Sequence, residues 1–472
     1  MNGTRRQIGR WSIRWDESLA DRAYDEGWWT DRTLADALAD ASRETPERVL
    51  LVDGSVLLTA RTLHSKALSL AYAMQARMQQ GSVVSFMLPN WHEAAVIYAA
   101  ATLAGMVANP ILPSLRDHDL RFILSDADTR MIFIPQQFYG FDYADMLRRV
   151  AADLVSAPEI VVVRGEAGDL TSFDALLDRP IDAIVTEIAP DDVRMVMYTS
   201  GTTGRPKGVL HTHNTLHALL RQIGEHWLVK PGDSFLVPSP ISHIGGSIYA
   251  FEAPLLLGSR AVLMDKWDAN IAVELMMAQR VTHMAGATPF LQKLLEAARL
   301  ADTQLPDLKV FICGGASVAP SLISEAVSYF TRARVSRVYG STEVPVTTVG
   351  ALSERAMPEA AETDGKPGIA EVVLRDGNEI CARGPQMFVG YLHEADEMSA
   401  FDDAGFYRTG DQGAFTESGY LVVTGRIKDL IIRNGENIAP KEIEDLLIGH
   451  PDVVDIAIVG IPDARTGERA CA

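Results

Sequence analysis

Apolar residues along the chain alternate between two kinds of segment. Short runs that are almost entirely apolar, at 83–89, 131–135, 159–165 and 193–201, are typical of strands buried on both faces. Between them, residues 91–106 and 143–155 have the pattern of helices, and the alternation resumes from 260 to 341. This order predicts an α/β fold with parallel sheets covered on both faces, in which ligands bind beyond the carboxyl ends of the strands. After about Gly365, Gly and Asp-Gly turns predict antiparallel hairpins, and from Arg426 the order becomes strand, loop, helix, strand.

Charge and cysteine content exclude several classes of protein. The 472 residues include 62 acidic and 43 basic side chains, a net charge of -19, which disfavours nucleic acid or an anionic membrane as partner. Three cysteines cannot form a disulfide framework, and the N-terminus has no apolar signal region, so we expect a cytoplasmic protein. The longest apolar run, at 94–108, is too short to span a membrane and is better interpreted as a buried helix.

The most informative stretch is Y-T-S-G-T-T-G-R-P-K-G at 198–208, directly after a predicted strand. Its glycines allow the backbone to wrap an anion, its hydroxyls donate to phosphate oxygens, and Lys207 adds positive charge. The alternative is a Ser/Thr/Gly surface turn, which the buried strand before it disfavours. The loop lacks the Gly-Lys-Ser/Thr ending of a Walker loop. No G-x-G-x-x-G, G-x-S-x-G, H-E-x-x-H or C-x-x-C motif supports a dinucleotide, hydrolase, zinc protease or thiol-redox function.

Three further motifs are weak separately. In Y-G-S-T-E at 339–343, Tyr339 offers a ring for stacking on a base, Thr342 a donor to phosphate and Glu343 an oxygen ligand for Mg²⁺. Taken alone, that glutamate is more often a solvated loop acid. In Y-R-T-G-D at 407–411, Asp411 could accept from both ribose hydroxyls or simply close a turn. The third motif, G-R-I-K-D at 425–429, could be only a charged linker.

In this order, the motifs resemble those of the adenylate-forming superfamily, and most closely its acyl-CoA synthetase branch. The resemblance runs from about Thr33 to the last residue and includes L-P-N-W-H-E-A at 88–94, G-Y-L-H-E-A-D-E at 390–397 and I-V-G-I-P-D-A-R-T-G-E at 458–468. It implies an N-terminal extension at 1–32 and a large domain at 33–425. That domain contains two parallel αβ-layered subdomains and a β-rich, distorted-barrel subdomain at about 365–425. Residues 426–472 are then a hinge and the start of a small α+β C-terminal domain whose remainder is absent.

The resemblance also implies an activity and its residues. Such enzymes activate a carboxylic acid with ATP and Mg²⁺ and transfer the acyl group from the adenylate to coenzyme A. The implied catalytic residues are Lys207, His243, Thr342, Glu343 and Arg426, with Glu343 as the metal ligand. The implied nucleotide-binding residues are Thr199, Ser200, Gly201, Thr202, Thr203, Gly204, Lys207, Gly314, Gly315, Ala316, Tyr339, Gly340, Ser341, Thr342, Asp411 and Arg426. Lys428 matches the hinge, and Gly435 the coenzyme A tunnel.

The segment 238–251 matches the one that lines the acyl pocket in this branch. There, His243 would lie beside the carboxylate, although a lone histidine is often structural. Gly245 and Gly246 would leave volume, and Tyr249 would form a wall. The segment has no acidic side chain, which disfavours an α-amino acid substrate, and Y-G-S-T-E lacks the tryptophan-rich run of acetate-specific relatives. We expect a medium-chain, alicyclic or aromatic acid.

The sequence ends at E-R-A-C-A, whereas such enzymes continue to a P-K-x-x-x-G-K motif whose lysine reaches the substrate carboxylate. We therefore expect these 472 residues to bind ATP and to adenylate poorly. Two alternatives remain open at this stage. One is a stand-alone adenylating enzyme that loads a carrier protein, and the other is a catalytically impaired nucleotide-binding form.

Overall fold

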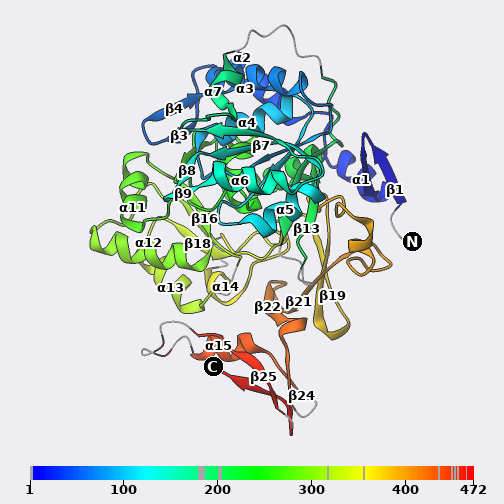
Figure 1. Cartoon of the computed structure of the whole chain (residues 1–472). Coiled ribbons are helices and arrows are strands. Elements are labelled where there is room, and N and C mark those ends of the chain that lie inside the picture. The colour runs from blue at the N-terminus through cyan, green and yellow to red at the C-terminus, as the bar shows by residue number, and fades with distance from the viewer. Residues whose placement is uncertain are drawn as a thin grey trace.

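The computed structural model describes residues 4–178, 186–199, 205–315, 318–353, 357–433, 436–447, 450, 453, 456–463 and 465–472. Two seven-stranded sheets form the body of the molecule (Figure 1). The first has the order β11 (Thr171–Ser172), β10 (Glu159–Val163), β7 (Thr129–Pro135), β5 (Val83–Phe86), β6 (Val107–Pro110), β12 (Val193–Thr199), β13 (Lys207–Thr212). The second has the order β18 (Arg334–Arg337), β17 (Val310–Cys313), β16 (His283–Gly286), β14 (Ser234–Val237), β15 (Arg260–Leu263), β3 (Val49–Asp53), β4 (Val56–Thr59).

The prediction of parallel sheets needs one correction. Six strands of each sheet run parallel, but β13 is antiparallel to β12 and β4 is antiparallel to β3. Both exceptions follow their partner after a short connection, which permits only a hairpin. The sheets are therefore mixed, with an antiparallel strand at one edge of each.

Helices precede, connect and follow the strands of the two sheets. They are α2 (Leu34–Glu44), α3 (Ala60–Gln75), α4 (His92–Leu103), α5 (Asp117–Asp126), α6 (Tyr143–Ala152), α7 (Phe173–Leu177), α8 (His213–His226), α9 (Ile244–Ser247), the π-helix η1 (Ile248–Glu252), α10 (Ala253–Leu256), α11 (Ala269–Ala278), α12 (Thr288–Leu300), α13 (Pro320–Tyr329) and α14 (Met357–Glu362). Side-chain caps fix some of their starts. Thr33 forms a capping box at α2, and Thr212 forms one at α8.

The apolar run at 94–108 is a core helix and the strand after it. Every residue of α4 from Glu93 to Thr102 is buried, and its apolar side chains share one cluster with Phe133 of the first sheet and Phe235 of the second. Gly105, with a φ of +65°, turns the chain into β6. Within the described residues, no helix is both long and apolar enough to cross a membrane.

The β-rich region consists of one antiparallel sheet, as the turn pattern predicted. Its order is β19 (Glu371–Arg375), β20 (Glu379–Arg383), β21 (Tyr407–Phe415), β22 (Leu421–Arg426). The N-terminal segment is more structured than its sequence indicated. It forms the hairpin β1 (Thr4–Ile8) and β2 (Trp11–Trp15) and the helix α1 (Glu17–Asp25). Arg14 donates its backbone N–H to the carbonyl of Val389, 2.7 Å away, and Trp29 donates to the carbonyl of Pro385 at 2.9 Å.

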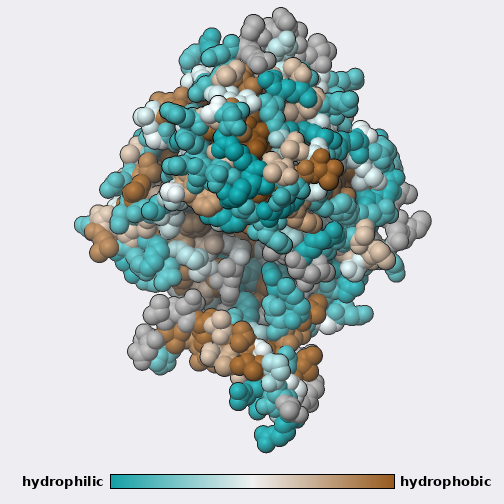
Figure 2. All heavy atoms as spheres, in the orientation of Figure 1, coloured by the Kyte–Doolittle hydropathy of each residue, from teal (hydrophilic) through white to brown (hydrophobic). Residues whose placement is uncertain are grey.

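The C-terminal part lies beside the body of the molecule (Figure 1). It contains the sheet β24 (Glu436–Ile438), β23 (Ile431–Arg433), β26 (Gly467–Cys471), β25 (Val459–Asp463) and the helix α15 (Pro440–Leu447). Apolar residues reach its surface in Figure 2, and the exposed fractions are 54% for Ile432, 77% for Leu446 and 54% for Val459. The described part of this region therefore buries little of its apolar surface.

Candidate functional site

The predicted phosphate loop joins two antiparallel strands. Thr199 at the end of β12 pairs with Lys207 at the start of β13, so the two strands form an antiparallel pair. Ser200, Gly201, Thr202, Thr203 and Gly204 lie outside the described residues. This pairing gives a structural reason for the missing Walker ending. A Walker loop opens a helix whose N-terminus faces the phosphates, whereas this loop returns into the sheet.

Lys207 is held beside the segment that follows Gly390. Its Nζ lies 4.9 Å from the centre of the Tyr391 ring and 3.5 Å from the carbonyl oxygen of Asp396. Arg205, two residues earlier, donates to the carboxylate of Asp396 at 2.9 Å. The last described residues of the loop are thus fixed against a segment almost 200 positions further along the chain.

The other side of the loop has a second anchor. Tyr198 of β12 donates its hydroxyl to Asp126 Oδ2 at 2.8 Å, and His393 Nε2 lies 2.7 Å from Asp126 Oδ1. Burial and the Asp126 carboxylate raise the pKa of Tyr198, so this hydroxyl keeps its proton. The described residues on both sides of the predicted phosphate loop are therefore held by polar contacts.

Tyr339 and Asp411, predicted to bind the base and the ribose, are directly connected. Tyr339 follows β18 and donates its hydroxyl to Asp411 Oδ2 at 2.7 Å. Asp411 lies on β21 opposite Arg426 of β22, whose Nε is 3.2 Å from Asp411 Oδ1. Burial raises the pKa of the Asp411 carboxyl, while Tyr339 and Arg426 favour its charged form. The Tyr339 ring and the Asp411 carboxylate are thereby held at a fixed separation.

The glycines predicted to lie along the base have different surroundings. A side chain at Gly314 would have its Cβ 2.9 Å from the carbonyl oxygen of Val338, so the ends of β17 and β18 approach closely here. Gly315 has a φ of +84° and open space where a Cβ would lie. Such a position can lie flat against a planar ligand. Ala316 lies outside the described residues.

Glu343, the predicted Mg²⁺ ligand, is buried next to two tyrosines. Its Oε1 accepts from the hydroxyl of Tyr391 at 3.0 Å, and that hydroxyl lies 3.3 Å from the hydroxyl of Tyr407. Burial and the neighbouring Glu343 charge raise the pKa of both tyrosines. Mg²⁺ is commonly bound by one or two carboxylates together with phosphate oxygens and waters, so a single oriented carboxylate fits this ion.

Thr342 and Glu343 are positioned by their backbone. His211 of β13 donates from Nε2 to the carbonyl oxygen of Thr342, 2.8 Å away. Burial lowers the pKa of His211 to about 4, so the ring is neutral and can donate from only one nitrogen. Ser341 accepts from the backbone N–H of Val344 at 3.2 Å. At Gly340, a Cβ would lie 2.6 Å from the nitrogen of Val346, so this turn requires glycine.

The segment predicted to line the acyl pocket, residues 238–251, contains α9 and most of the π-helix η1. His243 is the N-terminal flanking residue of α9, and its side chain reaches solvent although the surrounding protein lowers its pKa by desolvation. A Cβ at Gly245 would meet nothing within 4 Å, which agrees with open volume there. At Gly246 it would lie 2.1 Å from the carbonyl oxygen of Pro240, so close backbone packing already requires that glycine. Tyr249 is buried and stacks on Phe235, with ring centres 5.1 Å apart.

The hinge and tunnel predictions fall on the C-terminal part. Lys428 lies exposed in the short helix η5 (Ile427–Asp429), directly after the strand that carries Arg426. Gly435 lies outside the described residues. The roles of both residues stay predictions.

Sequence reasoning missed several residues of the site. Tyr391 and Asp396 belong to a motif that was recognised as a whole, but only the fold shows that they contact Glu343 and Lys207. His211 and Asp126 gave no signal, because an isolated histidine or aspartate is common on any helix or strand. Their roles depend on contacts between segments more than 70 positions apart.

An α/β fold that brings a cationic side chain, a tyrosine ring and two carboxylates together near the ends of its strands is typical of nucleotide-binding enzymes. The comparisons then identify the family. Residues 38–392 match the AMP-binding enzymes, and residues 442–472 match the C-terminal domain of AMP-binding enzymes. The chain belongs to this family, and we conclude that it is an adenylate-forming ligase.

Relatives of known activity and structure cover most of the chain. It is 33% identical to the medium-chain fatty-acid–CoA ligase of Escherichia coli (strain K12), over 95% of this chain and 81% of that protein. It is 31% identical to the 3-[(3aS,4S,7aS)-7a-methyl-1,5-dioxo-octahydro-1H-inden-4-yl]propanoyl:CoA ligase of Rhodococcus jostii (strain RHA1), over 92% of this chain and 87% of that protein. The crystal structure of ATP-bound MatB from Rhodopseudomonas palustris superposes with a TM-score of 0.82 and 26% identity, covering 93% and 88% of the two chains.

Proposed function

We propose that this protein converts a carboxylic acid and ATP into an acyl-adenylate and then transfers the acyl group to coenzyme A. The observation that carries the proposal is the convergence of Lys207, Tyr339, Glu343 and Asp411 through the contacts described above. These residues come from three separate parts of the chain, namely β13, the loop after β18 and β21, yet each has a partner that fixes its orientation. An arrangement of this kind supports positioning and charge stabilisation rather than covalent catalysis.

The proposed division of labour follows from the chemistry of each group. Lys207 and the loop 199–204 would bind the β- and γ-phosphates and stabilise the departing pyrophosphate. Tyr339 would stack on the base, and Asp411 would accept from the ribose hydroxyls. Thr342 would contact the α-phosphate, and Arg426 would make a second ribose or phosphate contact. Glu343 would hold Mg²⁺, which neutralises phosphate charge when bound.

For the acid, we propose a medium-chain, alicyclic or aromatic substrate. No acidic residue occurs between 238 and 251, and the next one, Glu252, is buried and ion-paired with Arg194. It also accepts a hydrogen bond from Tyr98, so its charge is already balanced inside the protein rather than by a substrate ammonium group. The substrates named for the two relatives, a medium-chain fatty acid and a fused-ring propanoate, support the same size class.

Exchange of labelled pyrophosphate into ATP tests the first half-reaction. We would compare acetate, octanoate, cyclohexanecarboxylate, benzoate and alanine at equal concentrations. We expect maximal exchange with one of the three larger acids, and a maximum with acetate or alanine would contradict the substrate class. Adding coenzyme A should then yield a thioester detectable by mass spectrometry. Adenylate formation without that thioester, but with acylation of a carrier-protein pantetheine, would identify the carrier-loading enzyme instead.

A further inference from the structure

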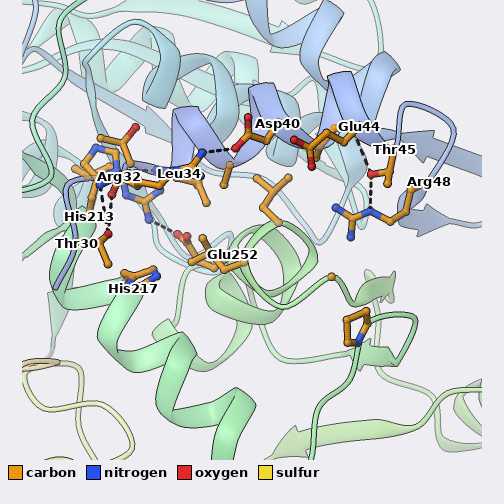
Figure 3. Close-up of a pocket in the computed structure, with 18 of the residues that line it drawn as sticks. Thr30, Arg32, Leu34, Asp40, Glu44, Thr45, Arg48, His213, His217 and Glu252 are labelled. Atoms are coloured by element: carbon orange, nitrogen blue, oxygen red, sulfur yellow. Dashed lines mark hydrogen bonds and ion pairs between the residues drawn. The ribbon is translucent and has the colours of Figure 1, made fainter. Parts of the chain in front are cut away.

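A second cavity lies away from the nucleotide site. It has a volume of about 510 Å³ and lies between α2, α8 and α10 (Figure 3). Among the residues that line it are none of those assigned above to the nucleotide, the metal or the acyl pocket. The volume falls within the range of about 300–1,000 Å³ that is typical of small-molecule sites.

The cavity has apolar walls and a polar floor. Leu34, Ala37 and Ala41 of α2 face Leu255 and Leu256 of α10 across it. Arg32, Glu44 and Thr45 at its rim are exposed, so a ligand can enter from solvent. These walls can accommodate a hydrocarbon body, whose transfer from water is worth about 25 cal/mol per Å² of buried apolar surface.

Arg48 is the one arginine of the lining whose charge is not balanced by a carboxylate among the described residues. Its Nη1 donates to the carbonyl oxygen of Pro254 at 2.9 Å, and its Nε donates to Thr45 Oγ1 at 3.2 Å. Both partners are neutral. Partial burial lowers the pKa of this guanidinium, with no opposing charge nearby to raise it.

The other charged groups of the lining are neutralised. Arg32 is ion-paired with Asp40, and Arg194 is ion-paired with Glu252. Glu44 is paired with Arg43, 2.9 Å away, which does not line the cavity. The lining has three arginines and three carboxylates and is formally neutral, and Arg48, at the end opposite His213 in Figure 3, is its one arginine without a carboxylate partner among the described residues.

The floor also contains a histidine ring. His213 is buried, and its Nδ1 accepts from the backbone N–H of Leu34 at 3.3 Å. Burial and the nearby charge of Arg194 hold the pKa of His213 well below its usual range, so the ring is neutral and its proton is on Nε2. The floor thus includes a neutral imidazole ring, and the charge of Arg48 disfavours a cationic ligand.

We propose that this cavity is a second ligand site that takes an amphipathic monoanion. The anionic head pairs with Arg48, and the apolar body lies along the walls formed by α2 and α10. The site does not depend on the activity proposed above, because it uses none of the same residues. A charge-assisted contact to a half-buried guanidinium supplies the selectivity for an anion over an amine.

Soaking crystals of the full chain with 8-bromooctanoate locates the site directly. We expect an anomalous bromine signal between α2 and α10. A signal confined to the segment 238–251, or no signal at all, would overturn the proposal. This measurement uses the unaltered protein, so it does not depend on the folding of any variant.

Fluorine NMR with 8,8,8-trifluorooctanoate measures binding in solution without turnover. ATP is left out so that the probe cannot be activated, and we expect a saturable bound resonance. Arg48→Met should weaken its affinity at least about tenfold, and Ala41→Phe, which fills the cavity, should remove it. Arg61→Met is the matched control, because that exposed arginine lies outside the cavity. An affinity unchanged by both cavity variants refutes the site, as does equal binding of the fluorinated octylamine. Replacing the carboxylate with a sulfonate distinguishes the two possible anionic heads.

Discussion

The contact between Tyr339 and Asp411 allows the two expected functions of one tyrosine to be separated. Tyr339→Phe removes the hydroxyl that donates to Asp411 Oδ2 over 2.7 Å and keeps the ring. Tyr339→Ala removes both the hydroxyl and the ring. If the ring stacks on the base and the hydroxyl orients the ribose-binding carboxylate, the two variants must weaken ATP binding by different amounts.

The magnitudes follow from the surroundings of Asp411. A hydrogen bond to a charged group is worth about 1.5–3 kcal/mol. Arg426 still holds Asp411 Oδ1 at 3.2 Å in the Phe variant, so the carboxylate stays partly anchored and the lower value applies. That value corresponds to about a tenfold rise in the Kd for ATP. Loss of stacking adds about 1–3 kcal/mol in Tyr339→Ala, which is a further rise in Kd of about 5- to 150-fold.

Isothermal titration of ATP into each variant measures these constants. Tyr420→Phe is a suitable control in the same β-rich region, because the described residues include no hydrogen-bond partner for that hydroxyl. An unchanged Kd for Tyr339→Phe would show that the hydroxyl does not position Asp411. Equal Kd values for Tyr339→Phe and Tyr339→Ala would show that the ring does not stack.

Three further predictions concern the residues around the phosphate loop. Tyr391→Phe removes the donor to Glu343, so pyrophosphate exchange should require several-fold more Mg²⁺; an unchanged Mg²⁺ requirement would refute this role. Lys207→Ala should lower kcat for exchange about 10²- to 10³-fold, as expected for loss of charge stabilisation. Arg205→Ala should change kcat and KM less than threefold, because exposed ion pairs contribute little. Equal losses of kcat in Lys207→Ala and Arg205→Ala would contradict this difference between the two residues. For His211, the pKa of about 4 means that the unfolded chain takes up a proton below pH 6.5 while the folded protein does not. Urea unfolding should therefore show that the free energy of unfolding falls by up to about 3 kcal/mol from pH 6.5 to 4, and His211→Gln should reduce this fall. An equal fall in the variant and in the unaltered protein would contradict the prediction.

The amino-acid sequence alone determined the fold class, the order of the motifs and their position after strands. Apolar runs predicted the interior strands of both sheets, because a strand covered on both faces must be apolar along its whole length. The loops after β12, β14, β17 and β18 follow from the same rule, since chemistry-bearing residues after parallel strands meet at one edge of a sheet. These signals are local and periodic, so a single sequence contains them.

Only the tertiary structure decided which distant residues contact and orient the predicted site residues. The support of Glu343 by Tyr391 and the contact of His211 with Thr342 both join segments far apart in the chain. Gly246 shows the same limit, because only the neighbouring backbone of Pro240 reveals why no side chain fits there. The cavity beside Arg48 had no sequence signal either, since an unbalanced charge is recognised only when its neighbours are known. Local pattern determines the elements and the chemistry they carry, whereas packing between elements determines which of those groups can act together.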